Sequence, residues 1–240
     1  MPTESAPSHV IVSGLESVGA TVSLSPEESH YLLRVCRVRA GDRVIATDGL
    51  GTRSTVRVLE ARSPVTAEIE SLDRQVRRCE AWVMCGVPEG ERADWMVEKL
   101  AELGVAAFQP IDCDRGGWGR AGLRMDRWQR LARAALRQSQ GRFAMELRPP
   151  TSIDAALDAL AEGAECWLAA PSGAAACTCR PRAEGVVTGA VGPSSGFAPR
   201  ELRILESRGF TAISLSTSRL RTETAALAWG AWWAASTGFP

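Results

Sequence analysis

The alternation of hydrophobic and polar positions changes its period near residues 74–79. Before this point, short runs rich in Val and Thr alternate apolar with polar residues, which is typical of half-buried β-strands. We expect strands over 43–47, 52–59 and 65–69, with a hairpin turn at Asp48-Gly49. One helix precedes them, because Ser25-Pro26-Glu27-Glu28 combines a capping serine, an N1 proline and an N3 glutamate. Residues 1–75 therefore predict a small β-barrel-like module.

From residue 76 to residue 240, apolar strands alternate with amphipathic helices. The expected strands cover 81–87, 105–110, 166–170, 186–191 and 213–215, and the expected helices cover 91–103, 124–140, 153–160, 199–208 and 222–235. In the first of these helices, Trp95, Met96, Leu100 and Leu103 are expected to face the core. Strands separated by helices predict an α/β domain with a largely parallel sheet.

Charge is balanced over the whole chain but not along it. Between Asp114 and Arg148 there are nine arginines against three acidic residues. Arg127, Arg130, Arg133 and Arg137 recur at helical spacing, so they share one face, which indicates either a solvated helix or contact with nucleic-acid phosphates. Lys99 is the only lysine and is a place to look for chemistry that arginine cannot perform.

The remaining composition narrows the class of protein. Seven cysteines are scattered without a CxxC pair and only two histidines are present, so we expect no metal site and reduced, buried thiols. The N-terminus lacks a signal pattern, and the longest apolar stretch, residues 225–235, is too short to span a membrane. The sequence therefore predicts a cytoplasmic protein.

Two segments could carry chemistry. The turn from Gly192 to Phe197 follows a buried strand and precedes a helix, so its amides could bind a polar cofactor, although it could also be an ordinary loop. Thr222 is a plausible N-cap of the last helix, with Arg221 just before it, which suits an anionic or polar ligand. No Ser/His/Asp arrangement or carboxylate pair is evident, which favours a reaction whose reactivity comes from a cofactor.

Several motifs together resemble one known family. The segment from His30 to Asp42 is similar to its His-x-x-x-x-Val-Leu-Arg-x-x-x-Gly-Asp, and Lys99 to Val105 resembles its Lys-Ala-x-Glu-Leu-Gly-Val. Arg127-Trp128-Gln129, Gln138 to Arg142, and Gly192 to Phe197 match three further motifs, while Leu220 to Ala226 repeats Leu-Arg-Thr-Glu-Thr-Ala-Ala without change. The chain thus resembles the RsmE-type family of SPOUT methyltransferases, which methylate N3 of a uridine in small-subunit ribosomal RNA.

This resemblance implies a SPOUT α/β domain with a C-terminal trefoil knot, after an N-terminal PUA-like RNA-binding barrel. It implies S-adenosylmethionine as cofactor, a homodimer, and small-subunit rRNA or the assembled subunit as partner. Arg221 and Glu223 are expected to be catalytic. The expected RNA-binding residues are Arg34, Arg37, Lys99, Arg127 and Arg142, and the expected cofactor-binding residues are Ala170, Gly192, Ser194, Ser195, Gly196, Leu215, Ser216, Leu220, Thr222 and Thr224.

The chain also departs from the family pattern around the cofactor. Ser194 and Ser195 replace Glu and Gly, so we expect strain if the glycine had a positive φ. Ala198 replaces the N-cap Ser/Thr, which should cost about 1 kcal/mol. These changes leave two alternatives open: a non-catalytic RNA-binding paralogue, and a methyltransferase with another RNA target.

Overall fold

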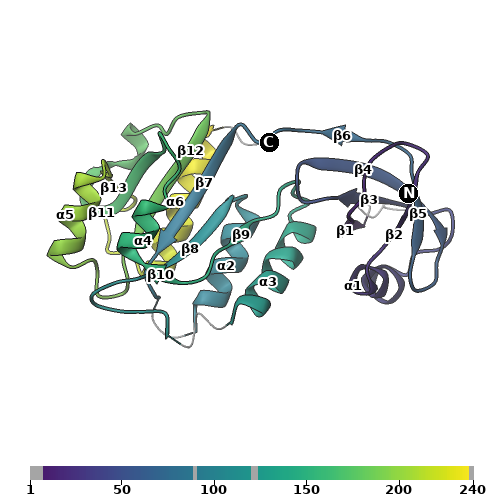
Figure 1. Cartoon of the computed structure of the whole chain (residues 1–240), viewed down its shortest axis with the longest axis horizontal. Helices are drawn as coiled ribbons and strands as arrows, with labels where there is room; N and C mark the ends of the chain where they lie inside the picture. The colour runs from purple at the N-terminus through teal and green to yellow at the C-terminus, as the bar shows by residue number, and fades with distance from the viewer. Residues whose placement is uncertain (1–7, 89–90, 120–123, 238–240) are drawn as a thin grey trace. The chain divides into compact units, whose positions relative to one another are not determined.

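The computed structural model describes residues 8–88, 91–119 and 124–237. The chain divides into two compact units (Figure 1). The first contains the residues up to Arg77 together with Leu136–Ala144, and the second contains Arg78–Ala135 and the residues from Met145 onward. Within the described ranges, no helix is long and apolar enough to cross a membrane.

The first unit is built on a six-stranded, mostly antiparallel sheet in the order β1-β3-β4-β5-β2, with β6 paired to β4. Its strands are β1 His9–Ile11, β2 Thr21–Ser23, β3 Arg43–Thr47, β4 Thr52–Glu60, β5 Thr66–Ile69 and β6 Asp73–Arg74. In β4, buried and partly exposed residues alternate, and Val56 and Val58 lie fully inside. The strands expected from the alternating pattern are therefore present.

The helix of this unit begins as the sequence predicts. The Ser25 side chain accepts a hydrogen bond from the Glu28 amide at 3.2 Å, and α1 covers Pro26–His30. The chain then continues as a π-helical turn, Tyr31–Cys36, which Arg37 ends in the left-handed conformation with φ of 56°. Leu32 is the side chain of this turn that is buried against the sheet.

The segment Leu136–Ala144 packs with the first unit, which the sequence pattern does not indicate. The Ala144 amide donates to the Gly49 carbonyl at 2.8 Å, and the Thr47 hydroxyl donates to the Arg142 carbonyl at 3.2 Å. Arg137 is also anchored here, because its side chain is 13% exposed and its guanidinium lies 3.0 Å from the buried Glu28 carboxylate. Arg137 is therefore paired within the protein, which its helical spacing with the other arginines did not indicate.

The second unit contains a seven-stranded parallel sheet in the order β10-β8-β7-β12-β11-β13, with β9 paired to β8. Its strands are β7 Cys79–Cys85, β8 Ala107–Asp112, β9 Glu146–Leu147, β10 Thr151–Ser152, β11 Glu165–Ala175, β12 Gly185–Val191 and β13 Thr211–Ser214. Its helices are α2 Ala93–Glu102, α4 Ile153–Asp158, α5 Pro199–Ser207 and α6 Thr222–Thr237, and α3 Met125–Gln138 continues into the segment that packs with the first unit.

Helices cover both faces of this sheet (Figure 1). Ala81 and Val83 of β7 point into one core with α2, α3 and α6, whereas their neighbour Met84 points into a second core with α4 and α5. Because successive strand residues face opposite sides, both faces must be apolar, and this explains the continuous apolar runs in the sequence. The α/β class expected from the sequence is confirmed.

One residue of α2 that was expected in the core is exposed to solvent. Met96 and Leu100 are fully buried as expected, but Trp95 is 50% exposed. The buried stripe of α2 consists of Ala93, Met96, Val97, Leu100 and Ala101. Each helical residue is rotated by about 100° from the next, so Trp95 falls beside this stripe and the prediction for it is wrong.

The last helix returns from the edge of the sheet to its centre. The chain leaves β13 at the edge, and α6 then packs against β7, β12 and α2. Trp229 lies fully buried over Gly189 of β12, where an added Cβ would come within 2.3 Å of the indole ring. This return is the course that a C-terminal knot requires, and it brings the start of α6 beside the carboxyl end of β12.

Candidate functional site

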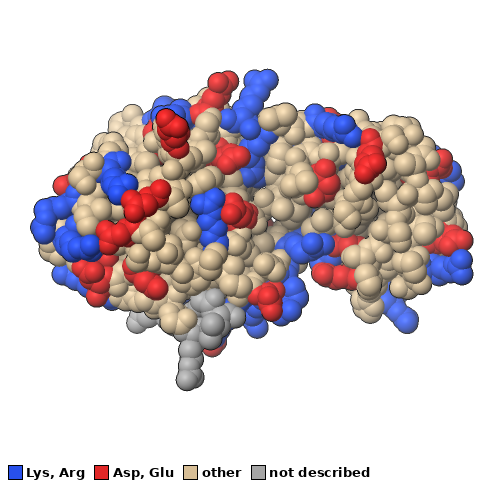
Figure 2. Space-filling model, in the orientation of Figure 1, with Lys and Arg blue, Asp and Glu red and all other residues tan. Residues whose placement is uncertain are grey.

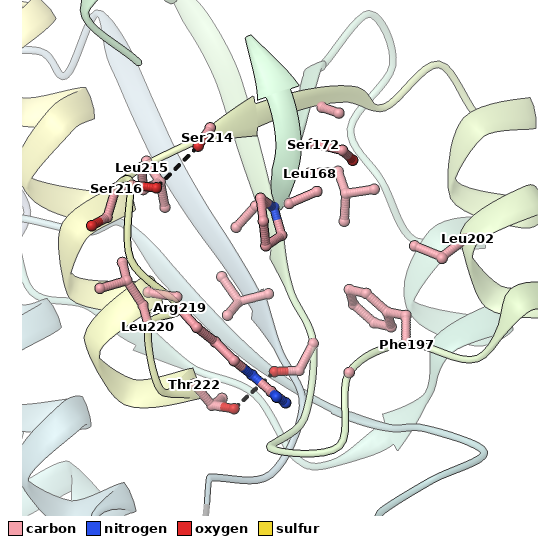
Figure 3. A pocket seen from close by; sticks show the side chains of 18 of the residues that line it. Leu168, Ser172, Phe197, Leu202, Ser214, Leu215, Ser216, Arg219, Leu220 and Thr222 are labelled. Carbon is pink, nitrogen blue, oxygen red and sulfur yellow. Dashed lines mark hydrogen bonds between the residues drawn. The ribbon is translucent and has the colours of Figure 1, made fainter. Parts of the chain in front are cut away.

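A cavity of about 480 Å³ opens at the carboxyl ends of β12 and β13 and beside the middle of β11. Ligands in parallel α/β sheets usually bind at this edge, because the connecting loops there present their backbone groups. Four segments wall the cavity: residues 168–172, the turn after β12, helix α5, and the loop between β13 and α6 (Figure 3). The apolar side chains that line it include Leu168, Val191, Phe197, Leu202, Leu215 and Leu220.

The turn after β12 accommodates its serines without backbone strain. Gly196 has a φ of 75°, but neither Ser194 nor Ser195 has a positive φ; among described non-glycine residues only Arg37 and Gln140 do. The strain expected at the replaced glycine is therefore absent. Gly192 is the tight position, because a Cβ there would lie 3.1 Å from the Phe197 amide nitrogen.

The buried Glu201 side chain compensates in part for the missing cap of α5. One oxygen of its carboxylate accepts the Ala198 amide at 2.6 Å, and the other accepts the Asp114 amide at 2.8 Å. The expected loss of a side-chain cap at Ala198 is real, because a methyl group accepts no hydrogen bond. Burial, followed by the negative charge of Glu201, raises the pKa of the neighbouring Cys113 to about 12.

Thr222 joins two walls of the cavity. It is the first residue of α6, where the expected range 222–235 places the start of the helix, and the expectation that it is the N-cap is wrong. Its hydroxyl instead donates to the Gly192 carbonyl at 3.0 Å, as the dashed line near Thr222 in Figure 3 shows. The start of α6 is thereby fixed to the turn after β12.

Of the ten expected cofactor-binding residues, eight line the cavity: Ala170, Gly192, Ser194, Gly196, Leu215, Ser216, Leu220 and Thr222. Ser195 does not line it, because its hydroxyl donates to the Arg115 carbonyl at 3.0 Å and so holds a neighbouring loop. Thr224 is exposed on α6 and also lies outside the lining.

The two expected catalytic residues also lie outside the lining. Arg221 is exposed, and no described residue forms a hydrogen bond or ion pair with its side chain. Glu223 is buried, and its carboxylate lies 3.1 Å from the Arg92 guanidinium. Glu223 therefore pairs with Arg92, a residue distant in the sequence, and not with the neighbouring Arg221.

Comparison with known proteins agrees with this geometry. Residues 75–234 match the model of an RNA methyltransferase domain, and residues 24–70 match an RNA methyltransferase PUA domain. The chain belongs to this RNA methyltransferase family. The SPOUT-type α/β fold with an N-terminal PUA-like unit, expected from the resemblance, is confirmed.

Relatives of the methyltransferase extend over most of its length. Ribosomal RNA small subunit methyltransferase E of Synechocystis is 24% identical over 231 residues, which cover 90% of this chain and 73% of that protein. The Mycobacterium tuberculosis protein of the same name is 28% identical over 234 residues, covering 90% and 86%. The crystal structure of the Neisseria gonorrhoeae enzyme, bound to S-adenosyl methionine, has a TM-score of 0.82 and 28% identity, covering 94% and 96%.

The expected RNA-binding residues of the methyltransferase fall into two groups. Arg34 and Arg37 are exposed. Lys99 contacts Glu102 at 2.5 Å and Glu98 at 2.8 Å, and these hydrogen bonds, that to Glu102 first, raise the pKa of its ammonium group.

Arg127 and Arg142 belong with Lys99, because both have acidic partners. Arg127 lies 2.6 Å from the Asp94 carboxylate, and Arg142 pairs with Asp73. Figure 2 shows basic and acidic side chains intermixed over the visible face. Three of the five expected RNA-binding residues thus have acidic partners, which the run of arginines in the sequence did not reveal.

Sequence reasoning missed several residues of the methyltransferase cavity. Phe197 and Leu202 are ordinary core residues by pattern, and only the arrangement of α5 over the turn exposes them to the cavity. Arg219 and Glu206 are the charged side chains in the lining. The position of Arg219 directly before the unchanged Leu220–Ala226 segment was the available signal.

Proposed function

We propose that this protein transfers a methyl group from S-adenosylmethionine to N3 of a uridine in small-subunit (16S) ribosomal RNA. The cavity carries the proposal, because it is walled by the Gly192 turn and by the start of the unchanged Leu220–Ala226 segment. The names of the relatives support rRNA as the substrate, and the ligand of the Neisseria gonorrhoeae structure supports the cofactor.

The residues present fit this cofactor. A volume of about 480 Å³ lies within the range of small-molecule sites, roughly 300–1,000 Å³. Apolar side chains such as Leu168 and Phe197 can sandwich an adenine ring, and backbone groups around Gly192 and Leu215 can bind its edge. The serines at 194, 216 and 218 offer hydroxyl groups at the same walls.

The cofactor, when bound, supplies an electrophilic methyl group on a sulfonium. The protein's task is then to place uracil N3 in line with that methyl and to favour loss of the N3 proton. We assign Arg221 to the second task, because a cation beside the ring stabilises the uracil anion. Glu201, Thr222 and the Glu223–Arg92 pair position the surrounding backbone.

No side chain in the described lining is well placed to act as a general base. Glu206 is the acidic residue of the lining, and it is exposed on α5. The proton therefore passes to solvent while Arg221 and backbone dipoles hold the anion, so the reaction should accelerate as pH rises toward the pKa of the imide.

RNA would be held by Arg34, Arg37, Lys99, Arg127 and Arg142, with the target base unstacked to reach the cavity. Because Lys99, Arg127 and Arg142 already have acidic partners, Arg34 and Arg37 should contribute more of the phosphate binding. We further propose a homodimer that works on the rRNA or on the assembled small subunit in the cytoplasm.

The rival reading, an RNA-binding protein without catalysis, drew its support from the serines in the cofactor turn. That support is weakened, since Ser194 and Ser195 adopt φ values open to any residue. A methyltransferase with another RNA target would use the same cavity and differs only in substrate.

The test combines binding with product analysis. Calorimetry should give a micromolar Kd for S-adenosylmethionine, roughly −8 kcal/mol. Incubation with small subunits that lack the modification should yield 3-methyluridine by nucleoside mass spectrometry. Arg221→Ala should abolish most turnover while leaving cofactor affinity unchanged, and Arg203→Ala, an exposed arginine of α5 outside the lining, is the matched control.

Each outcome bears on a separate claim. If cofactor does not bind at millimolar concentration, the catalytic proposal fails. Methylation of a different nucleoside would support the alternative RNA target. Full turnover in Arg221→Ala would remove Arg221 from the mechanism.

A further inference from the structure

One charged side chain of the cavity has no role in the proposed methyl transfer. Arg219 belongs to the loop between β13 and α6 and is the only basic residue in the described lining. Figure 3 shows its side chain extending from that loop toward Thr222 at the start of α6. We infer that Arg219 is a specificity-determining residue that binds the carboxylate of the cofactor's methionine moiety, an inference that rests on the proposed function.

Arg219 is available for such a ligand. No hydrogen bond or ion pair joins its side chain to another described residue, in contrast to Lys99, Arg127, Arg137 and Arg142. A guanidinium presents paired N–H groups that match the two oxygens of a carboxylate, so the contact can be bidentate.

The charge of the cofactor restricts where an arginine can help. Its sulfonium and ammonium groups are cationic and would be repelled by a guanidinium, whereas the carboxylate is its single anionic group. The carboxylate is therefore the group of this cofactor that an arginine binds by charge attraction as well as by hydrogen bonds. The other charged lining residue, Glu206, lies on α5, the helix that carries Leu202 on the opposite side of the cavity in Figure 3.

The exposure of Arg219 agrees with this orientation. The apolar walls formed by Leu168, Phe197 and Leu202 suit the adenine ring. The methyl group must remain open to an incoming base, so the methionine end has to lie toward solvent. Arg219 is exposed at the rim and lies beside Leu220 and Thr222, where that end would emerge.

An RNA phosphate offers the same anionic oxygens and is the competing source. The carboxylate is favoured because Arg219 belongs to the lining of the cavity, whereas Arg221, two residues later, does not. Ligands with and without a carboxylate separate the two sources directly.

The experiment measures Kd by calorimetry for the wild-type chain, Arg219→Met and Arg219→Lys. The methionine variant keeps the length of the side chain and removes its charge. S-adenosylmethionine and S-adenosylhomocysteine should each bind about tenfold more weakly to Arg219→Met, because one charge-assisted contact is lost at an exposed site. Arg219→Lys should recover part of the loss, since the charge stays and the fork geometry does not.

Decarboxylated S-adenosylmethionine is the deciding probe. It should bind Arg219→Met as well as or better than it binds the wild type, because both remaining charged groups of this ligand are cationic. Arg203→Ala serves as the control for removing an arginine charge outside the cavity, and unchanged thermal unfolding of each variant shows that the fold is intact.

Three results would overturn the inference. Arg219→Met could bind S-adenosylmethionine as tightly as the wild type does. It could lose affinity equally for the decarboxylated ligand, which would make Arg219 a residue that only shapes the cavity. It could bind RNA more weakly with cofactor affinity unchanged, which would assign the anion to phosphate. If the wild type binds none of these ligands, the proposed function is refuted as well. The wild-type binding measurement by itself identifies this outcome.

Discussion

Replacing Ala198 by serine should stabilise the second unit. Ala198 has φ of −72° and ψ of 157°, the extended conformation of an N-cap residue, and Pro199 follows at the first helical position. Glu201 already reaches back to the Ala198 amide at 2.6 Å, so one half of a capping box exists. A serine hydroxyl would add the other half by accepting the backbone N–H of Glu201.

The size of the stabilisation follows from the new hydrogen bond to the backbone N–H of Glu201. A side-chain cap is worth about 1 kcal/mol relative to alanine, in a range of roughly 0.5–2 kcal/mol. For a unit of this size, that gain should raise Tm by about 2–4 °C. Because Ala198 is only 8% exposed, the added oxygen has little access to water and depends on this hydrogen bond.

Tryptophan fluorescence isolates the unit in question. All eight tryptophans belong to the second unit, so denaturant unfolding followed by their emission reports on it alone; they are Trp82, Trp95, Trp118, Trp128, Trp167, Trp229, Trp232 and Trp233. Ala198→Thr and Ala198→Val form an isosteric pair that separates the cap from the added volume. If the threonine variant is no more stable than the valine variant, the capping argument is wrong.

Three other expectations concern packing, pH and thiol reactivity. Gly189→Ala should destabilise the second unit by about 1–3 kcal/mol, because its Cβ would overlap the Trp229 indole; unchanged fluorescence-detected unfolding would contradict this. Burial, then the positive charge of Arg53, lowers the pKa of His9 from 6.5 to about 4. Between pH 6.5 and pH 4 the His9 side chain binds a proton in the unfolded chain but not in the folded one. The free energy of unfolding, measured by calorimetry, should therefore be highest above pH 6.5 and fall by about 3 kcal/mol toward pH 4. The decrease should be smaller in His9→Leu. Iodoacetamide should label the exposed Cys177 first and spare Cys85, whose pKa burial raises; the reverse order in a peptide map would count against these burial assignments.

The hydrophobic pattern indicated strands of two kinds, those with one buried face and those buried on both faces. The alternation in β4 and the apolar run of β12 correspond to strands that the structure contains. The cap at Ser25 also formed as predicted, because a capping box depends only on residues three positions apart. Such local interactions do not depend on the tertiary structure, so the sequence predicts them directly.

The parts of the candidate site that consist of contiguous segments of the sequence were predictable. The turn at Gly192 and the loop before α6 line one cavity, and both stand out in the sequence as glycine-rich or unchanged family segments. The directions of individual side chains were not predictable. Ser195 faces the Arg115 carbonyl and Glu223 faces Arg92, and both partners come from distant loops.

The sequence by itself determined the class of the fold, the two kinds of unit and the loops that line the cavity, because periodicity, caps and motifs are properties of neighbouring residues. Only the tertiary structure decided which charges are free. Arg142 was expected to bind RNA and Arg137 belonged to the basic helix face, yet Asp73 and Glu28, far away in sequence, pair with them. Arg219 drew no prediction, yet it is the basic side chain in the cavity lining without a described partner. Coulombic attraction depends on distance in space, so an ion pair between residues far apart in the sequence exists only once the chain has folded.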